Sequence, residues 1–235
     1  MAVIGVYDSG IGGLTSIVEI LKRFPGNDIY YLADNLNHPF GTKSEEQLKE
    51  IVASGLNKVR AHSDVVVAAC NTASSISEDS DIIRLLPPVD LYRDEAKSTL
   101  IMATDRTLGN LHNLDGYKIA ETSELATLVE VQASLNHLKS SLNMDELIPY
   151  LEKHINRFKG VKRVLLGCSH YLYCKEQIKK CLGEVELADG NEHLLNELKN
   201  AVTARADFPS KITFDFTAQN ESKKYDNIIR LLMNS

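Results

Sequence analysis

The chain contains the stretches Val65-Val-Val-Ala-Ala-Cys70-Asn-Thr-Ala-Ser74 and Val164-Leu-Leu-Gly-Cys168-Ser-His-Tyr171. In both, a short apolar run ends at a cysteine and a polar run follows. Runs of this length, rich in Val and Leu and followed by helix-starting residues, predict buried parallel strands that end at helix N-termini. Small ligands bind at such strand ends in open α/β sheets. We therefore expect Cys70 and Cys168 to face one cleft, where one thiol could remove a proton and the other could return it.

Strand and helix patterns alternate along nearly the whole chain, which predicts an α/β fold of mostly parallel sheets with helical crossovers. The predicted elements are strand 2–7, helix 14–24, strand 29–32, helix 44–61, strand 65–69, a helix from 72, strand 99–103, strand 117–120, helices 125–138 and 144–158, strand 164–166, helix 173–182, strand 185–188, helix 192–205, strand 211–216 and helix 225–233. The repeated strand–Cys–helix unit suggests two duplicated halves. Pro87-Pro88 disfavours both helix and interior strand, so we place residues 1–91 and 209–235 in a first domain and 92–208 in a second.

The composition is that of an ordinary globular protein, with 235 residues, 43% of them hydrophobic and 25% charged. A net charge of −6 argues against nucleic-acid binding as the main function. The N-terminus lacks a basic segment typical of secretion signals, and no apolar stretch approaches the roughly 20 residues that span a bilayer. We therefore expect a cytoplasmic protein without a membrane or nucleic-acid partner.

Four cysteines in such a chain are not expected to form structural disulfides. Their spacing also fails the paired pattern of zinc sites, so no metal site is predicted. Cys174 and Cys181 are seven residues apart on one predicted helix face, and we interpret them as small apolar residues. For Cys70 and Cys168, the alternative to acid–base chemistry is a pair of buried, inert thiols.

A glycine-rich stretch, Asp8-Ser9-Gly10-Ile11-Gly12-Gly13, follows the first predicted strand and precedes a helix. Glycines let the backbone approach an anion, and a helix N-terminus supplies free N–H groups. The spacing is not that of a dinucleotide or phosphate loop, so the pattern favours a small carboxylate. The alternative is a glycine turn with a helix cap at Asp8 or Ser9.

Two further features are ambiguous from composition alone. Pro39-Phe40-Gly41-Thr42 has the character of a plain loop before a helix that begins at Ser44, with Gln47 at capping-box spacing. His170 could be a core histidine, or it could hydrogen-bond near the Cys168 thiol and alter its reactivity.

The chain nevertheless resembles the glutamate racemases in four blocks that occur in the family's order and at similar separations. The blocks are Asp8–Thr15, Pro39–Ser44, Ala69–Ser74 and Gly167–Tyr171. The resemblance implies two pseudosymmetric α/β domains with the active site in the cleft between them. It also implies interconversion of L- and D-glutamate without pyridoxal phosphate or any other cofactor, to supply D-glutamate for peptidoglycan. Glutamate would be the small-molecule partner, and a homodimer is compatible with the family.

Carried over by position, the resemblance makes Cys70 and Cys168 the two acid–base thiols, with Asp8 and His170 assisting proton transfer. The residues it assigns to the substrate pocket are Ser9, Pro39, Phe40, Gly41, Asn71, Thr72, Thr104, Thr107, Glu130 and Ser169. Phe40 stands where the family usually has tyrosine, Ser169 stands where it has threonine, and the region from about 89 to 130 is short. Two alternatives therefore stay open: a related racemase with another preference, such as aspartate, or a non-catalytic descendant that binds an amino acid or a protein.

Overall fold

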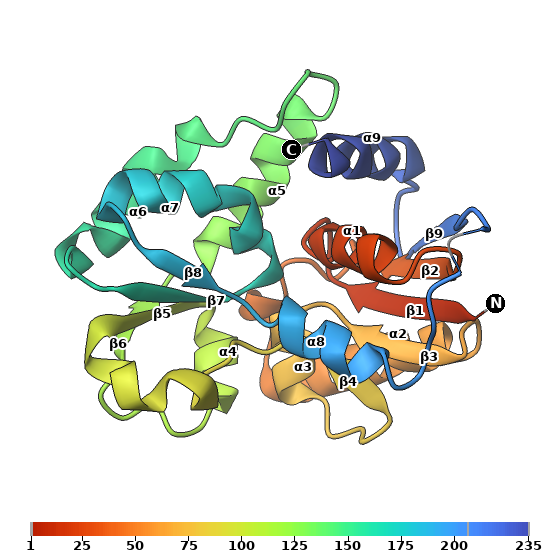
Figure 1. The fold of residues 1–235 in the computed structure, drawn as a ribbon, viewed down its shortest axis with the longest axis horizontal. Coiled ribbons are helices and arrows are strands. Elements are labelled where there is room, and N and C mark those ends of the chain that lie inside the picture. Colours follow the sequence, from red (N-terminus) through yellow and green to blue (C-terminus); the bar gives the residue numbers. More distant parts are fainter. Residues whose placement is uncertain (1, 206, 235) are drawn as a thin grey trace.

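The computed structural model describes residues 2–205 and 207–234, and its strands form two sheets in which all neighbouring strands are parallel. The first sheet has the order β4-β3-β1-β2-β9 and the second the order β6-β5-β7-β8. The strands are β1 (Val3–Asp8), β2 (Asp28–Ala33), β3 (Val65–Ala68), β4 (Ile82–Arg84), β5 (Thr99–Ala103), β6 (Lys118–Glu121), β7 (Arg163–Gly167), β8 (Glu186–Ala188) and β9 (Ile212–Phe216). Figure 1 shows the two sheets in two halves that lie side by side, which confirms the predicted α/β class.

Helices flank both sheets (Figure 1). The α-helices are α1 (Leu14–Arg23), α2 (Glu45–Arg60), α3 (Asn71–Ile76), α4 (Asp105–Asn110), α5 (Glu124–Asn136), α6 (Ile148–Ile155), α7 (Lys175–Leu182), α8 (Asn191–Leu198) and α9 (Ser222–Met233). Short 3-10 helices are η1 (Phe40–Thr42), η2 (Asp90–Ser98), η3 (Asp145–Leu147), η4 (Asn156–Phe158) and η5 (Ser169–Cys174). The predicted capping box is confirmed, because Ser44 and Gln47 exchange side-chain and backbone hydrogen bonds at the start of α2.

Alternate residues of β1 enter different apolar clusters on the two faces of the first sheet. Ile4 and Val6 pack in a cluster with α1, whereas Tyr7 packs in a cluster with Leu48 and Leu56 of α2. Both faces are buried, as expected for a parallel sheet covered by crossover helices. The carboxyl ends of the strands are therefore the places where polar residues can gather.

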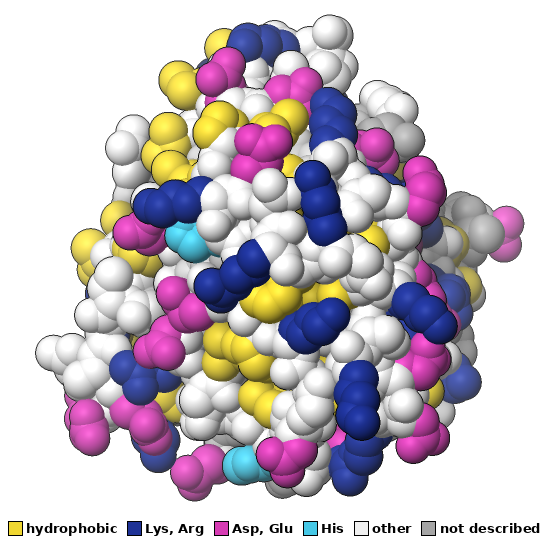
Figure 2. Space-filling model, turned by 90° about the vertical axis from the view of Figure 1, so that its left-hand side faces the viewer, with side chains coloured by type: hydrophobic (Ala, Val, Ile, Leu, Met, Phe, Trp, Pro, Cys, Tyr) yellow, Lys and Arg dark blue, Asp and Glu magenta, His cyan; other side chains and the backbone are white. Residues whose placement is uncertain are grey.

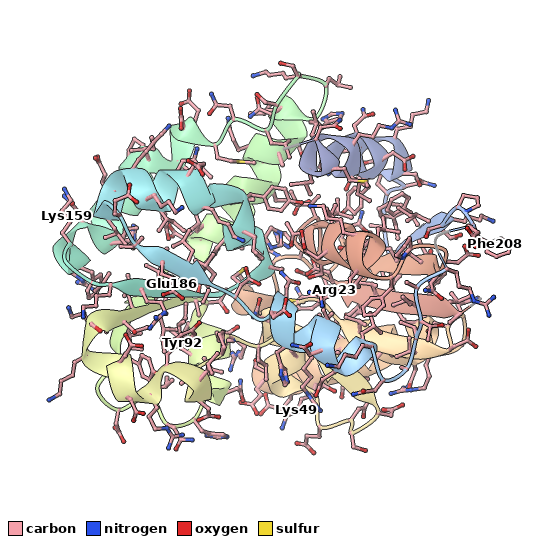
Figure 3. The ribbon with its side chains drawn as sticks, viewed as in Figure 1. Arg23, Lys49, Tyr92, Lys159, Glu186 and Phe208 are labelled. Atoms are coloured by element: carbon pink, nitrogen blue, oxygen red, sulfur yellow. The ribbon has the colours of Figure 1, made fainter. Side chains whose placement is uncertain are left out.

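The two halves are packed against one another through a continuous core. The largest apolar cluster includes Ile17 of the first half as well as Met102 and Leu166 of the second. Helix α8 follows the second sheet but lies against α1, where Arg23, labelled in Figure 3, pairs with Glu192 at 3.1 Å. Strand β9 returns to the first sheet by pairing with β2. The domain limits at 91 and 209 stay a prediction.

Several predicted elements differ from the observed ones. Strand β4 was not predicted, and the predicted helix 173–182 is preceded by η5, so that α7 begins at Lys175. The predicted helix 144–158 is divided into η3, α6 and η4, with Pro149 in the first turn of α6, where its missing N–H is tolerated. The predicted helix 192–205 ends at Leu198, because the following segment is bonded to the first half: the Asn27 side chain donates to the Thr203 carbonyl at 2.8 Å.

None of the described helices is long and apolar enough to cross a membrane. On the face shown in Figure 2, Lys and Arg side chains lie among Asp and Glu side chains rather than in a basic patch.

Candidate active site

The two cysteines lie at corresponding places in the two sheets. Cys70 follows β3 and directly precedes α3, and Cys168 follows β7 and directly precedes η5. Both side chains are buried. Burial raises the pKa of Cys70 well above its usual value, the negative charges of Asp8 and Cys168 raise it further, and backbone N–H groups of Ala73 and Thr72 oppose the effect. Negative charge on either neighbour therefore disfavours the thiolate form of Cys70.

Cys168 is the end of a polar chain that leads into the second half. Its sulfur lies 3.9 Å from Nδ1 of His170, and Nε2 of that ring lies 2.9 Å from Oε2 of Glu130 on α5. Burial would lower the pKa of His170, but its hydrogen bonds to Cys168 and Glu130 outweigh this and raise the pKa well above its ordinary value. Burial would raise the pKa of Glu130, and the hydrogen bond from His170 outweighs it, so that pKa is lowered. The pair is therefore an imidazolium and a carboxylate.

Asp8, at the end of β1, is bonded to both halves. Its carboxylate accepts a hydrogen bond from the backbone N–H of Gly10 at 2.7 Å and from the hydroxyl of Ser169 at 3.0 Å. Burial raises the pKa of Asp8 to about 6, although the charge of His170 and both hydrogen bonds act in the opposite direction. Asp8 is thus a fully buried carboxyl group that titrates close to neutrality.

The glycine-rich stretch packs against side chains of the second half. A Cβ on Gly12 would lie 2.2 Å from Oγ of Ser169, and one on Gly10 would lie 2.6 Å from Oε2 of Glu130. The N–H of Ile11 donates to that same Glu130 oxygen at 3.1 Å. The carboxylate at the Ile11 N–H is therefore the protein's own. Binding of a small carboxylate by the rest of this stretch stays a prediction.

Three threonines join α3 to α4 across the two halves. The hydroxyl of Thr72 lies 3.2 Å from those of Thr104 and Thr107, which lie 3.0 Å from each other. Beside Thr72, the side chain of Asn71 is buried, and neither its oxygen nor its nitrogen has a hydrogen-bond partner among the described residues. Buried amides are rarely left unpaired, so this one is available to a ligand next to Cys70.

The remaining predicted site residues lie on the Cys70 side. Ser9 Oγ lies 4.0 Å from the Cys70 sulfur. Pro39 follows a cis peptide bond, and Phe40 is buried against Tyr7 with ring centroids 6.2 Å apart. A Cβ on Gly41 would meet only Ser123 of the second half, at 4.0 Å. Phe40 thus contributes to the core beside the site.

Two residues beside the Glu130–His170 pair were not predicted. The ring of His38 lies 5.4 Å from that of His170, and its Nδ1 lies 3.4 Å from Ser9 Oγ. Lys224 on α9 has its ammonium group 3.8 Å from Glu130, 2.7 Å from Glu221 and 3.3 Å from Ser134. Neither has a local sequence signal, because residues 38, 130, 170 and 224 are brought together only by the fold.

Comparison with known proteins finds no matching family model, but many similar sequences and structures. The chain is 32% identical to glutamate racemase of Campylobacter curvus over 220 residues, which cover 83% of this chain and 81% of that protein. It is 31% identical to glutamate racemase 2 of Bacillus subtilis over 223 residues, covering 86% and 82%. The chain also superimposes on the crystal structure of Escherichia coli glutamate racemase in complex with L-glutamate and activator, with a TM-score of 0.78 and 21% identity. The superposition covers 98% of this chain and 94% of that one, and it shows a shared fold.

Proposed function

The chain belongs to the glutamate racemase family, and from that premise we propose that it interconverts L- and D-glutamate by proton transfer at the α-carbon between Cys70 and Cys168. The observation that carries the proposal is the pair of buried cysteines at matching strand ends of the two sheets, with the unpaired amide of Asn71 beside one of them. Glutamate is named as a ligand of the similar Escherichia coli enzyme. The product D-glutamate would serve peptidoglycan synthesis.

Inversion of the α-carbon requires a base on one face of the substrate and an acid on the other. The surroundings of the two thiols differ. The raised pKa of Cys70, which results first from burial, keeps it as the neutral thiol, and Nδ1 of His170 lies 3.9 Å from the Cys168 sulfur, where it can take part in proton transfer. Each turnover moves a proton onto the thiol that acts as base and takes one from the thiol that acts as acid. Turnover of the opposite enantiomer reverses both transfers.

Removal of the α-proton places negative charge on the substrate carboxylate, and fixed donors must stabilise it. The amide of Asn71 can donate to this carboxylate without giving up any bond within the described protein. The hydroxyls of Thr72, Thr104 and Thr107 form a polar cluster on the same side. These groups act through position and hydrogen bonding, so the proposed reaction requires no step by a cofactor.

The proposal is tested by incubating the protein with single enantiomers of glutamate and of aspartate in deuterated water. Circular dichroism follows inversion, and proton NMR follows exchange of the α-hydrogen. Loss of optical activity for glutamate alone supports the proposal. Loss for aspartate alone would show a racemase of another preference, and absence of exchange in any amino acid would show a binding protein.

Single variants C70S and C168S test the two-base assignment. Each should lower racemisation by about 10²–10⁴-fold or more, because a serine hydroxyl cannot replace a thiol as acid or base. Any α-hydrogen exchange that persists should be confined to one enantiomer, and to the opposite enantiomer in the other variant. Near-full turnover by either variant would overturn the assignment.

A further inference from the structure

A polar cavity lies beside the thiol site. It has a volume of about 440 Å³ and is lined by residues of both halves, among them Ser9, His38, Glu130 and Lys224. Two of these, His38 and Glu130, are groups that can bind a metal ion. Because the cavity is open to solvent on one side, a small ion can reach them without unfolding of either half.

Two imidazoles and one carboxylate from three separate segments come together here: His38 and Glu130 line the cavity, and the buried His170 lies next to them. His38 lies in the loop before η1, Glu130 lies on α5 and His170 lies in η5. One donor atom of each lies within 4.8 Å of the donors of the other two. Ligands of a single tetrahedral ion lie about 3.3 Å apart, given bonds of about 2.0–2.1 Å, so a rotation of the His38 ring toward the other two would complete the set.

The hydrogen bonds of the two histidines favour the same interpretation. His38 has its Nδ1 near Ser9 Oγ, whereas its Nε2 is buried and has no hydrogen-bond partner in residues 2–205 and 207–234. In His170, Nδ1 faces the Cys168 sulfur and Nε2 faces Glu130. Metal-binding histidines commonly hold one ring nitrogen in a hydrogen bond and use the other as ligand.

We propose that His38, Glu130 and His170 form a site for a divalent transition-metal ion such as Zn²⁺, and that its binding reversibly stops the racemase. Two imidazole nitrogens and one carboxylate oxygen suit Zn²⁺ or Co²⁺ rather than Mg²⁺ or Ca²⁺. Metal binding would release the Nε2 proton of the His170 imidazolium to solvent, and the metal would occupy the Glu130 and His170 atoms that now pair with each other, so that His170 could no longer serve the Cys168 thiol. The inhibitory part rests on the proposed function, but the metal site itself does not.

The test begins with protein freed of metal by a chelator, which should retain full racemase activity. Zn²⁺ binding is measured by competition with a chromogenic chelator, and inhibition is measured in parallel. In the H38N variant, half-inhibition, scored against that variant's own metal-free activity, should require about tenfold or more Zn²⁺. H112N, which replaces an exposed histidine, is the matched control and should behave as the wild type.

Co²⁺ distinguishes this site from binding at the thiols. Ligation by nitrogen and oxygen alone should give weak visible bands and no intense sulfur-to-cobalt charge-transfer band in the near ultraviolet. A strong charge-transfer band, equal Zn²⁺ sensitivity of H38N and the wild type, or absence of binding would each overturn the proposal. Absence of racemase activity in the metal-free wild type would instead refute the proposed function, and the competition and Co²⁺ data would still decide the metal site.

Discussion

Replacement of Asp8 by asparagine should stabilise the protein at neutral pH. Burial raises the pKa of Asp8 from 3.8 to about 6. This difference, at about 1.4 kcal/mol for each pH unit, means that the ionised carboxylate costs the native state about 3 kcal/mol at pH 7. Asparagine cannot ionise, yet its side-chain oxygen can still accept from the N–H of Gly10 and its nitrogen can donate to Ser169. The D8N variant thus removes the cost and retains both hydrogen bonds.

The sign of the effect follows from the proton that each state binds. Below about pH 3 the carboxyl is protonated in both the native and the unfolded chain, and its ionisation contributes nothing. Between about pH 4 and 6 the unfolded chain releases its proton first, so the wild type loses stability as the pH rises. Above about pH 6 the loss is complete. The difference in unfolding free energy, D8N minus wild type, should therefore increase by about 2–3 kcal/mol between pH 4 and pH 7.

Urea unfolding followed by circular dichroism at a series of pH values measures this difference. The D115N variant, which removes an exposed carboxylate, is the control and should follow the wild type at every pH. Racemase activity of D8N should fall, since Asp8 is proposed to assist proton transfer. If the unfolding free energies of D8N and the wild type change in parallel from pH 4 to pH 8, burial does not destabilise the ionised form of Asp8, and the expectation is wrong.

Three further variants test separate parts of the site. N71A should change the free energy of unfolding by less than about 1 kcal/mol, because the amide has no partner in the described protein. The same variant should lower kcat/KM for glutamate by about 10–100-fold, and a normal kcat/KM would exclude Asn71 from substrate binding. K224M should lower kcat and destabilise the protein by about 1–3 kcal/mol, because it removes the cation paired with Glu221 and leaves His170 as the one cation beside Glu130 among the described contacts. K224R should restore much of both, and an unchanged kcat in K224M would show that Lys224 does not position Glu130. G12A should lower the melting temperature and turnover together, because its Cβ would lie 2.2 Å from Ser169 Oγ and 2.7 Å from His170 Nδ1. G109A, whose Cβ meets nothing within 4 Å, is the control and should lower neither. Equal melting temperatures of the two variants would contradict the close packing at Gly12.

The fold was predictable wherever local pattern and tertiary structure agree. The strand Thr99–Ala103 was predicted with its observed limits, and both cysteines were expected at strand ends, because apolar runs and helix-starting residues mark those positions in the sequence. Strand β4 has only three residues, and it is a strand because Ile82 and its neighbours pair with β3. A pairing of this kind leaves no periodic signal.

The site was predictable as a set of residues but not as a set of contacts. The glycine spacing indicated a close approach of backbone to an anion, but it gave no sign that Glu130, more than a hundred residues away, accepts a hydrogen bond from the N–H of Ile11. The roles of His38 and Lys224 depend on neighbours that only the packing of α5 and α9 supplies. Burial and charge, which set the pKa values of Asp8 and His170, likewise arise only in the folded chain.

The chemistry proposed here depends on the difference between the two halves as much as on their likeness. Cys70 and Cys168 lie at matching strand ends of the two sheets, but two thiols with identical neighbours would favour the same protonation state. The neighbours differ: the carboxyl of Asp8 acts on Cys70, and the imidazolium of His170 lies beside Cys168. Ser169 donates a hydrogen bond to Asp8 and directly precedes His170 in the sequence, so it links the surroundings of the two thiols. We infer that this asymmetry, built on a nearly symmetric pair of sheets, is what allows one sulfur to begin as base while the other begins as acid.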